Sequence, residues 1–150
     1  RTIRENSDAE EVIFSANREM ERLFADAEAF KPLAIPYSPD HMIHSGIEPL
    51  FFFFFSDRGS REKGISEALA SYRQKHKAEP KIIAVQGFGL FSCEKKKKMA
   101  LLARDFFLDE IKIAVASESF GGIHPLPQAQ VDFISNWEVE RYRRSVSEKD

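Results

Sequence analysis

Two histidines lie close together in the segment SPDHMIHSG, where His41 and His44 are three positions apart. Two imidazoles at this spacing can share one divalent ion with a carboxylate such as that of Asp40, and zinc or manganese accepts such a set of ligands. A pair that lacks a third ligand also occurs as a purely structural feature. The segment therefore indicates either a metal site at His41 and His44 or two structural histidines.

Two glycines, Gly87 and Gly89, follow the apolar run KIIAVQ and precede a segment with helical character. A dinucleotide-binding fingerprint has this order of strand, turn and helix, and it needs glycine at its first, third and sixth positions. The sixth position here is Ser92, and the bulky Phe88 stands where the phosphates would approach. The stretch indicates either a nucleotide-binding oxidoreductase module or an ordinary turn in which the glycines only allow the backbone to bend.

Four lysines, residues 95 to 98, stand near the expected start of a helix. Cations are unfavourable at the positive end of the helix dipole. Either the helix begins earlier, with Ser92 as its cap, or the lysines contact an anion or form a solvated face. Nucleophilic catalysis has no support, because Cys93 has no histidine beside it and no serine occupies a nucleophile elbow. The acidic residues are too scattered to identify an acid–base pair, so no catalytic residue is assigned.

Three segments carry apolar residues at helical spacing. Ser7 and Glu10 form a capping-box pattern, which predicts a helix over about residues 8 to 29. A second helix is expected over about residues 61 to 77. A last one is expected over residues 128 to 146, after an irregular stretch that holds two glycines and two prolines.

Strands are expected in the apolar runs of the chain. LFFFFF, residues 50 to 55, shows no polar alternation and predicts a strand buried on both faces, and KIIAVQ, residues 81 to 86, predicts another. LFSCE, residues 90 to 94, is expected to return as the second strand of a glycine hairpin. The next segment has helical spacing, but residues 111 to 115 also alternate as a strand would, so both structures remain open there.

The composition is that of an ordinary globular domain. The chain has 150 residues, of which 43% are hydrophobic and 31% charged, and 22 basic against 24 acidic side chains give a net charge of -2. We expect one domain over residues 1 to 150, with no nucleic acid and no membrane as partner. The single cysteine, Cys93, cannot form an intramolecular disulfide and fits a cytoplasmic location. A start at Arg1 and a polar end at Asp150 suggest a portion of a longer polypeptide.

Several short motifs occur in an order that resembles a known family. They are PYSPDHMIHSGIEPLFF, then VQGFGLFSCEKKKKMALLARDFFLDEIKIA, then ASESFGGIHPLPQAQVDFISNWEVERYR. Over residues 35 to 145 the chain is similar to the later part of the class II aldolase/adducin-like domain of bifunctional rhamnulose-1-phosphate aldolase/short-chain dehydrogenase proteins. The resemblance implies a three-layer alpha/beta/alpha class II aldolase-like fold, of which the chain would be the carboxyl-terminal portion.

The resemblance also implies a chemistry. The parent enzyme would cleave a ketose 1-phosphate such as rhamnulose 1-phosphate into dihydroxyacetone phosphate and lactaldehyde, with a zinc ion that polarises the oxygens of the sugar phosphate. His41 and His44 would contribute to the metal site, and Gly87 and Gly89 would shape the turn that faces the substrate. We expect the parent enzyme to be a homo-oligomer and this portion to be inactive alone.

Two features depart from the family pattern. The family's pair of histidines one residue apart does not occur in the chain, and Gln86 stands in the turn where simpler class II aldolases carry a histidine ligand. Glutamine is a poor zinc ligand, so either His41 supplies the missing imidazole or the metal has been lost. The alternative functions are a non-catalytic interaction domain of the same fold and the nucleotide-binding oxidoreductase module.

Overall fold

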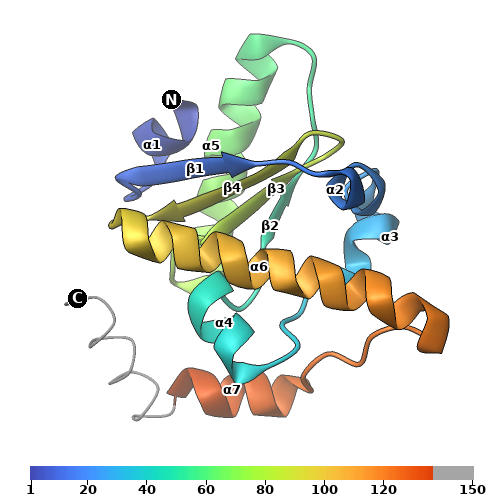
Figure 1. The fold of residues 1–150 in the computed structure, drawn as a ribbon. Coiled ribbons are helices and arrows are strands. Elements are labelled where there is room, and N and C mark those ends of the chain that lie inside the picture. Colours follow the sequence, from blue (N-terminus) through green and yellow to red (C-terminus); the bar gives the residue numbers. More distant parts are fainter. Residues whose placement is uncertain (137–150) are drawn as a thin grey trace.

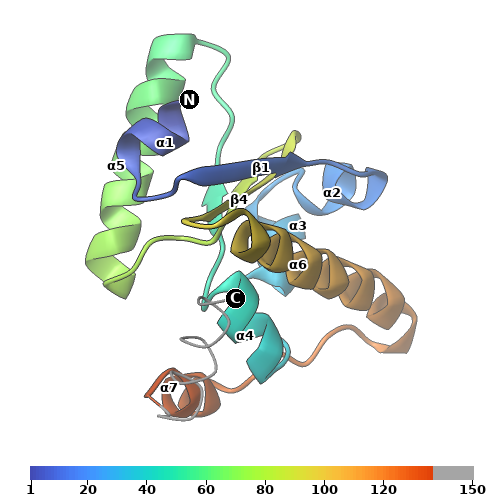
Figure 2. The same ribbon diagram turned by 60° about the vertical axis from the view of Figure 1, so that its left-hand side comes forward.

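The computed structural model describes residues 1–136, which form a four-stranded sheet with helices on both faces (Figures 1 and 2). The strands are β1 (Glu11–Ser15), β2 (Leu50–Phe52), β3 (Ile82–Val85) and β4 (Gly89–Glu94). The α-helices are α1 (Thr2–Asn6), α2 (Arg18–Leu23), α3 (Ala27–Phe30), α4 (Pro39–Ser45), α5 (Arg58–His76), α6 (Lys97–Ser117) and α7 (Gln128–Asn136). The short 3₁₀ helices η1 (Lys31–Leu33) and η2 (Glu118–Phe120) follow α3 and α6. In this part of the chain no helix has the length and apolar character that a membrane span requires.

The strands lie side by side in the order β1-β4-β3-β2. β2 and β3 are parallel, with Phe52 opposite Val85, and α5 makes the crossover between them. β3 and β4 form an antiparallel hairpin in which Val85 faces Gly89, and β1 pairs with the outer edge of β4. The glycine turn therefore lies where β1, β2 and β3 all end.

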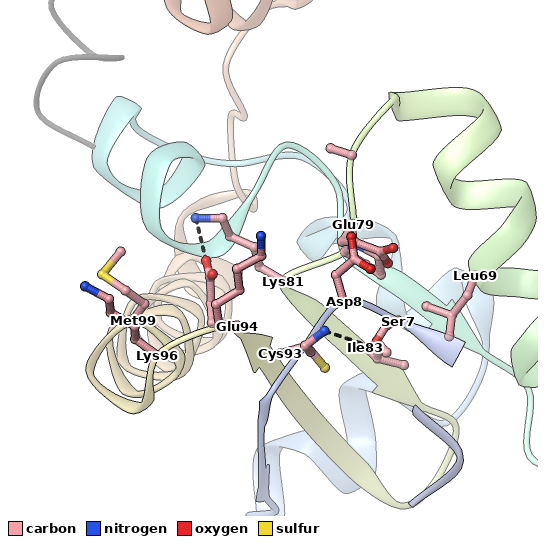
Figure 3. Close-up of a pocket in the computed structure, with 14 residues that line it drawn as sticks. Ser7, Asp8, Leu69, Glu79, Lys81, Ile83, Cys93, Glu94, Lys96 and Met99 are labelled. Carbon is pink, nitrogen blue, oxygen red and sulfur yellow. Dashed lines mark hydrogen bonds and ion pairs between the residues drawn. The ribbon is translucent and has the colours of Figure 1, made fainter. Parts of the chain in front are cut away.

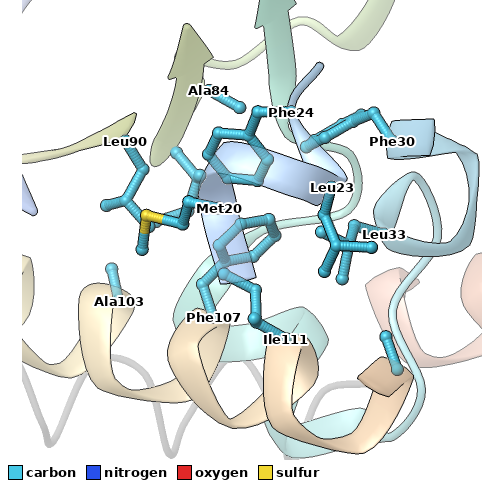
Figure 4. Close-up of a cluster of buried hydrophobic side chains, with 12 residues drawn as sticks. Met20, Leu23, Phe24, Phe30, Leu33, Ala84, Leu90, Ala103, Phe107 and Ile111 are labelled. Carbon is cyan, nitrogen blue, oxygen red and sulfur yellow. The ribbon is translucent and has the colours of Figure 1, made fainter. Parts of the chain in front are cut away.

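One face of the sheet is covered by α6 together with α2, α3 and η1. Ala84 and Leu90 of the sheet pack there with Phe107 and Ile111 of α6 and with Phe24, which follows α2 (Figure 4). The buried residues of α6 recur three and four positions apart, so one side of the helix is apolar. Burying a side chain of this size stabilises the folded state by roughly 2 to 3 kcal/mol.

The opposite face is covered by α1 and α5. Ile83 of β3 packs there with Ile65 and Leu69 of α5, whereas its neighbours Ile82 and Ala84 belong to the cluster under α6. This division follows from the alternation of side chains along a strand, and it explains why β3 reads as a continuous apolar run. The predicted three-layer α/β/α fold is confirmed.

Helix α4 lies beside α6, and α7 lies beside α4, outside the three layers (Figures 1 and 2). Ser38 is the N-cap of α4, and its hydroxyl oxygen accepts a hydrogen bond from the backbone N–H of His41. Met42, Val131 and Ile134 form a small third cluster between α4 and α7. The segment with the two histidines is thus a short helix that packs on α6 and not on the sheet.

The predicted helix over residues 8 to 29 is wrong, because this segment holds strand β1 and the short helices α2 and α3. Pairing with β4 draws the first part into the sheet. Asn17 and Asp26 then start new helices, since their side chains accept hydrogen bonds from the backbone N–H groups of Met20 and Ala29. Tertiary pairing has overridden a helical spacing of apolar residues.

The predicted strand over residues 50 to 55 is correct only for its first half, because β2 ends at Phe52. The side chains of residues 53 to 55 are 50%, 43% and 44% exposed, so the expected burial on both faces is wrong for them. Asp57 then caps α5 by accepting a hydrogen bond from the backbone N–H of Ser60. Three phenylalanines are thereby left at the surface.

The remaining predicted elements agree with the structure. Helix α5 corresponds to the helix expected over residues 61 to 77, and β3 and β4 correspond to the two strands of the glycine hairpin. Residues 111 to 115, for which helix and strand were both open, belong to α6. Helix α7 confirms the start of the last predicted helix, and residues 137 to 146 lie outside the described part of the chain.

Candidate functional site

The glycine turn connects two strands, so the order of strand, turn and helix that a dinucleotide site needs is absent. Gly87 has a φ of 63°, and an added Cβ atom would meet no atom of residues 1–136 within 4 Å. Gly89 has a φ of 150°, and its Cβ atom would lie 2.5 Å from the backbone oxygen of Ser15. Gly87 is therefore needed for its backbone conformation, and Gly89 also for space.

The polar groups of the turn bind other parts of the backbone. The backbone N–H of Gly87 donates to the oxygen of Phe24 at 2.9 Å, and that of Phe88 donates to the oxygen of Val85 at 3.0 Å. The side-chain amide of Gln86 donates to the oxygen of Ala25 at 2.9 Å. The turn is thus fastened to the segment after α2, and these amides are not free to cradle a phosphate.

His41 is buried between α4 and α6. Its Nδ1 atom lies 2.8 Å from the hydroxyl oxygen of Ser38, and its Nε2 atom lies 3.0 Å from a carboxylate oxygen of Asp109 on α6. The ring of His44 stacks on Phe106 with 4.4 Å between ring centroids. Both ring nitrogens of His41 are therefore engaged, and the histidine ties α4 to α6.

These histidines do not fit the zinc site that the family resemblance implies. Asp40, the carboxylate next to them in sequence, is exposed, and Asp109 is already hydrogen bonded to His41. Within residues 1–136 no group of three or more His, Cys, Asp and Glu side chains is placed to hold a metal ion. A tetrahedral zinc site needs at least three protein ligands with free lone pairs, so we derive no chemistry from a metal at this position.

The predicted histidine and glycine residues are not brought together. The β3–β4 hairpin, with Gly87 and Gly89, lies at one end of the sheet, and α4, with His41 and His44, lies away from that end in both views (Figures 1 and 2). Their closeness to a common substrate, which the resemblance implied, is not seen within this chain.

Glu110 is a buried carboxyl group that sequence reasoning missed. The residue is 2% exposed, and its Oε1 atom has no hydrogen-bond partner among the described residues. Burial, with a further contribution from the charge of Asp109, raises the pKa of Glu110 to about 8. A signal was present in the sequence, since Glu110 falls on the apolar stripe of α6 between Phe107 and Ile111.

A cavity of about 400 Å³ lies at the opposite end of β3 and β4 from the glycine turn (Figure 3). Its wall includes a buried ion pair, in which the Nζ atom of Lys81 lies 2.9 Å from a carboxylate oxygen of Glu94. Lys81 also donates to the backbone oxygen of Ile43 at 2.9 Å and so links the sheet to the end of α4. The volume is in the range of small-molecule sites.

The same cavity holds acidic groups and a thiol. Glu79 accepts a hydrogen bond from Arg73 at 2.9 Å through one carboxylate oxygen, and its other oxygen is buried without a partner in residues 1–136. Burial, reinforced by the charges of Glu94 and Glu79, raises the pKa of Cys93 to about 12. The thiol therefore stays protonated near neutral pH, and a protonated thiol is a poor nucleophile.

The lysines before α6 contribute to the rim of the cavity. Lys95 and Lys96 line it, and α6 begins at Lys97 with Lys96 as its N-cap residue. The alternative in which Ser92 caps the helix is wrong, because Ser92 is buried within β4.

Comparisons with known proteins give matches to solved structures but none by sequence. No family model and no curated protein matches the sequence. The structure is similar to the crystal structure of an aldolase II superfamily protein from Pseudomonas syringae, with a TM-score of 0.62 and 13% sequence identity. The match covers 93% of this chain and 54% of that chain, so this chain spans about half the length of its structural neighbour.

The match defines the class of fold. The four-stranded mixed sheet between α5 and α6 is a class II aldolase-like α/β/α fold. At 13% identity the likeness establishes the arrangement of the backbone and not the chemistry, because one fold hosts several activities.

Proposed function

We propose that this chain is a portion of a class II aldolase domain whose parent enzyme cleaves a ketose 1-phosphate of the rhamnulose 1-phosphate type. The products would be dihydroxyacetone phosphate and lactaldehyde. The observation that carries the proposal is the match of 93% of the chain to an aldolase II superfamily protein. The order of motifs over residues 35 to 145, which resembles the rhamnulose-1-phosphate aldolase group, supports this choice of substrate.

We further propose that the parent enzyme is cytoplasmic and homo-oligomeric, and that this portion and the rest of the parent have different roles in binding the substrate. Residues 1–136 do not offer a ligand set for zinc, so the ion and the substrate phosphate would be bound mainly by residues elsewhere in the parent. This portion would supply the α/β/α frame and the turn at Gly87 and Gly89. The open space beside Gly87 supports a position from which the turn can face a substrate.

The proposal is tested on the full product of the gene. Cleavage of L-rhamnulose 1-phosphate is followed by coupling dihydroxyacetone phosphate to the oxidation of NADH, before and after removal of metal with a chelator. We expect cleavage by the parent, loss of activity after chelation, recovery with zinc, and no activity from residues 1–150 alone. A parent that leaves ketose 1-phosphates intact would refute the aldolase function.

A non-catalytic interaction domain of the same fold is the second candidate. It is favoured by the hydrogen bonds that occupy His41 and Gln86, and by the phenylalanines exposed at the end of the sheet. Metal analysis of the purified parent separates the two candidates, because an interaction domain has no need of a stoichiometric ion.

A further inference from the structure

Five exposed phenylalanines surround the glycine turn at one end of the sheet. This phenylalanine surface is defined by Phe14, Phe53, Phe54, Phe55 and Phe88, which are between 43% and 55% exposed. Single exposed apolar side chains are ordinary, but a group of large ones marks a contact site. Neither the proposed aldolase chemistry nor the packing of the described residues accounts for this surface.

The rings contact one another. The centroids of Phe14 and Phe88 are 5.2 Å apart, and Phe88 stacks on Phe54 at 6.1 Å with 16° between the ring planes. The ring centroids of Phe55 and the buried Phe52 are 5.9 Å apart. Both rings lie against Gly64 of α5, where a larger residue would have a side chain in their place. Phe88 is held in place by the fastened glycine turn. Phe14, Phe54 and Phe88 therefore form one continuous group of rings, Phe55 packs on the buried Phe52 beneath it, and Phe53 packs on Phe51.

A groove of about 340 Å³ runs beside this surface, between α1, α5 and the sheet. Its floor belongs to the core on this face and is apolar, with Ile3, Ile65, Val85 and Phe91 among its lining residues. Phe54 and Phe88 belong both to the groove and to the phenylalanine surface. A large apolar side chain can therefore enter the groove while neighbouring residues lie across the rings.

The charged residues of the groove are mostly positive. Arg1, Arg58 and Arg61 line it against one acidic residue, Glu62, and Arg1 pairs with Glu5 of α1 at 2.9 Å. Arg58 pairs with Glu62 at 2.9 Å in an exposed contact that contributes little energy and exchanges readily. The guanidinium carbon of Arg61 lies 5.2 Å from the ring centroid of Phe54, and among residues 1–136 its side chain makes no hydrogen bond or ion pair.

We propose that the phenylalanine surface and its groove bind an acidic polypeptide segment that carries at least one large apolar side chain. The apolar side chain fills the groove, and carboxylates meet Arg58 and Arg61 at its rim. The rings outside the groove extend the apolar contact beyond the reach of a small molecule. Phe53 to Phe55 continue from β2, an edge strand, so the segment can lie along the open edge of the sheet.

The charge pattern favours this occupant over a second copy of the chain. A symmetric dimer through this surface would place the arginines of one groove near those of the other, because a two-fold contact is made by the same patch on both copies. Like charges at an interface oppose association, whereas an acidic segment neutralises them.

The experiment measures fluorescence anisotropy of a labelled acidic peptide with the full chain of residues 1–150. The probe has about twelve residues, with tryptophans spaced between glutamates, and its partner peptide has lysine in place of every glutamate. We expect micromolar binding of the acidic probe, weakened about tenfold by Phe88→Ser and at least about threefold by Arg61→Gln. The lysine peptide should bind at least about tenfold more weakly, and added salt should weaken the acidic probe.

Matched variants control for loss of apolar or basic surface. Phe120→Ser changes a residue of η2 that is 88% exposed, and Arg104→Gln changes an arginine of α6 that is paired with Asp105. Both should bind the probe as the unaltered chain does, and thermal unfolding verifies that every variant is folded. If Phe88→Ser lowers the melting temperature, Phe54→Ser replaces it, because Phe54 stacks on Phe88 and also lines the groove.

Three results would overturn the proposal. They are equal binding of the acidic and lysine peptides, unchanged binding by folded Phe88→Ser or Phe54→Ser, and a dimer in sedimentation experiments that Phe88→Ser abolishes. The last result would assign the surface to a second copy of the chain.

Discussion

Single residues of this chain act through partners that are far away in sequence. His41 contacts Asp109, which is 68 positions later, and Gln86 contacts Ala25, which is 61 positions earlier. The sequence identified His41 and Gln86 as unusual, because histidine pairs and turn residues can be found by type and spacing. Their actual partners could not be predicted, since no local pattern links a helix at residue 41 to one at residue 109.

The buried carboxyl of Glu110 makes stability depend on pH. The carboxyl of Glu110 has a pKa of about 8 in the folded state and an ordinary pKa of 4.5 in the unfolded state. Between these two pH values the folded state keeps the proton and the unfolded state has lost it. Stability therefore falls as the pH rises through this window, by up to roughly 1.4 kcal/mol per pH unit. Glu110→Gln removes the titration, so its unfolding free energy should vary less with pH and exceed that of the unaltered chain at pH 8.

Chemical denaturation at several pH values measures this effect. Glu67→Gln is the control, because Glu67 lies on α5 with a side chain that is 68% exposed. The control should follow the unaltered chain across the range. Parallel pH curves for the Glu110 variant and the unaltered chain would show that the buried carboxyl does not titrate in this window.

At the scale of elements, sequence patterns predicted a helix or strand correctly where every residue of the segment has the same kind of surroundings in the fold. Helix α5 and strands β3 and β4 were predicted close to their observed bounds, because their patterns and end signals agree. The prediction for the amino-terminal segment failed, since Val12 and Ile13 fit a helix by spacing while β4 offers both a strand partner. The strand predicted over residues 50 to 55 is too long, because only the first three of these residues pair with β3.

The two glycines of the hairpin should differ in their tolerance of a side chain. Gly89→Ala places a Cβ atom 2.5 Å from the oxygen of Ser15 and 2.9 Å from the ring of Phe14, so β1 and β4 must separate. We expect a loss of stability of roughly 3 kcal/mol or more. Gly87→Ala meets only the left-handed backbone and should cost about 1 kcal/mol. Equal melting temperatures for the two variants would contradict this geometry.

At the scale of the whole molecule, the α/β/α class was predicted from the order of motifs although individual elements were misplaced. The fold depends on two apolar strands enclosed by two long helices, and both the strands and the helices left clear patterns. The site was less predictable, because the implied metal chemistry finds no ligand set within residues 1–136. The cavity with Lys81 and Glu94 arises from tertiary contacts that have no sequence motif.

Lys81 pairs with Glu94 of β4 and also donates to the backbone oxygen of Ile43 at the end of α4, so its loss should affect both contacts. Lys81→Met alone leaves Glu94 poorly hydrated and unpaired, and we expect a cost of roughly 3 kcal/mol. Lys81→Met combined with Glu94→Leu restores apolar packing and should lie within about 1 kcal/mol of the unaltered chain. Denaturant unfolding of the single and double variants measures the coupling, and additive effects would contradict it.

The pairing of β1 with β4 has a consequence for how the chain folds during synthesis. Glu11 pairs with Glu94, so β1 cannot join the sheet until β4, which lies far later in the sequence, has also been translated. Contacts between such distant residues form slowly because a long loop must close first. Until then Val12 and Phe14 lack their partners, and the nascent chain carries an uncovered apolar segment that a ribosome-associated chaperone can bind.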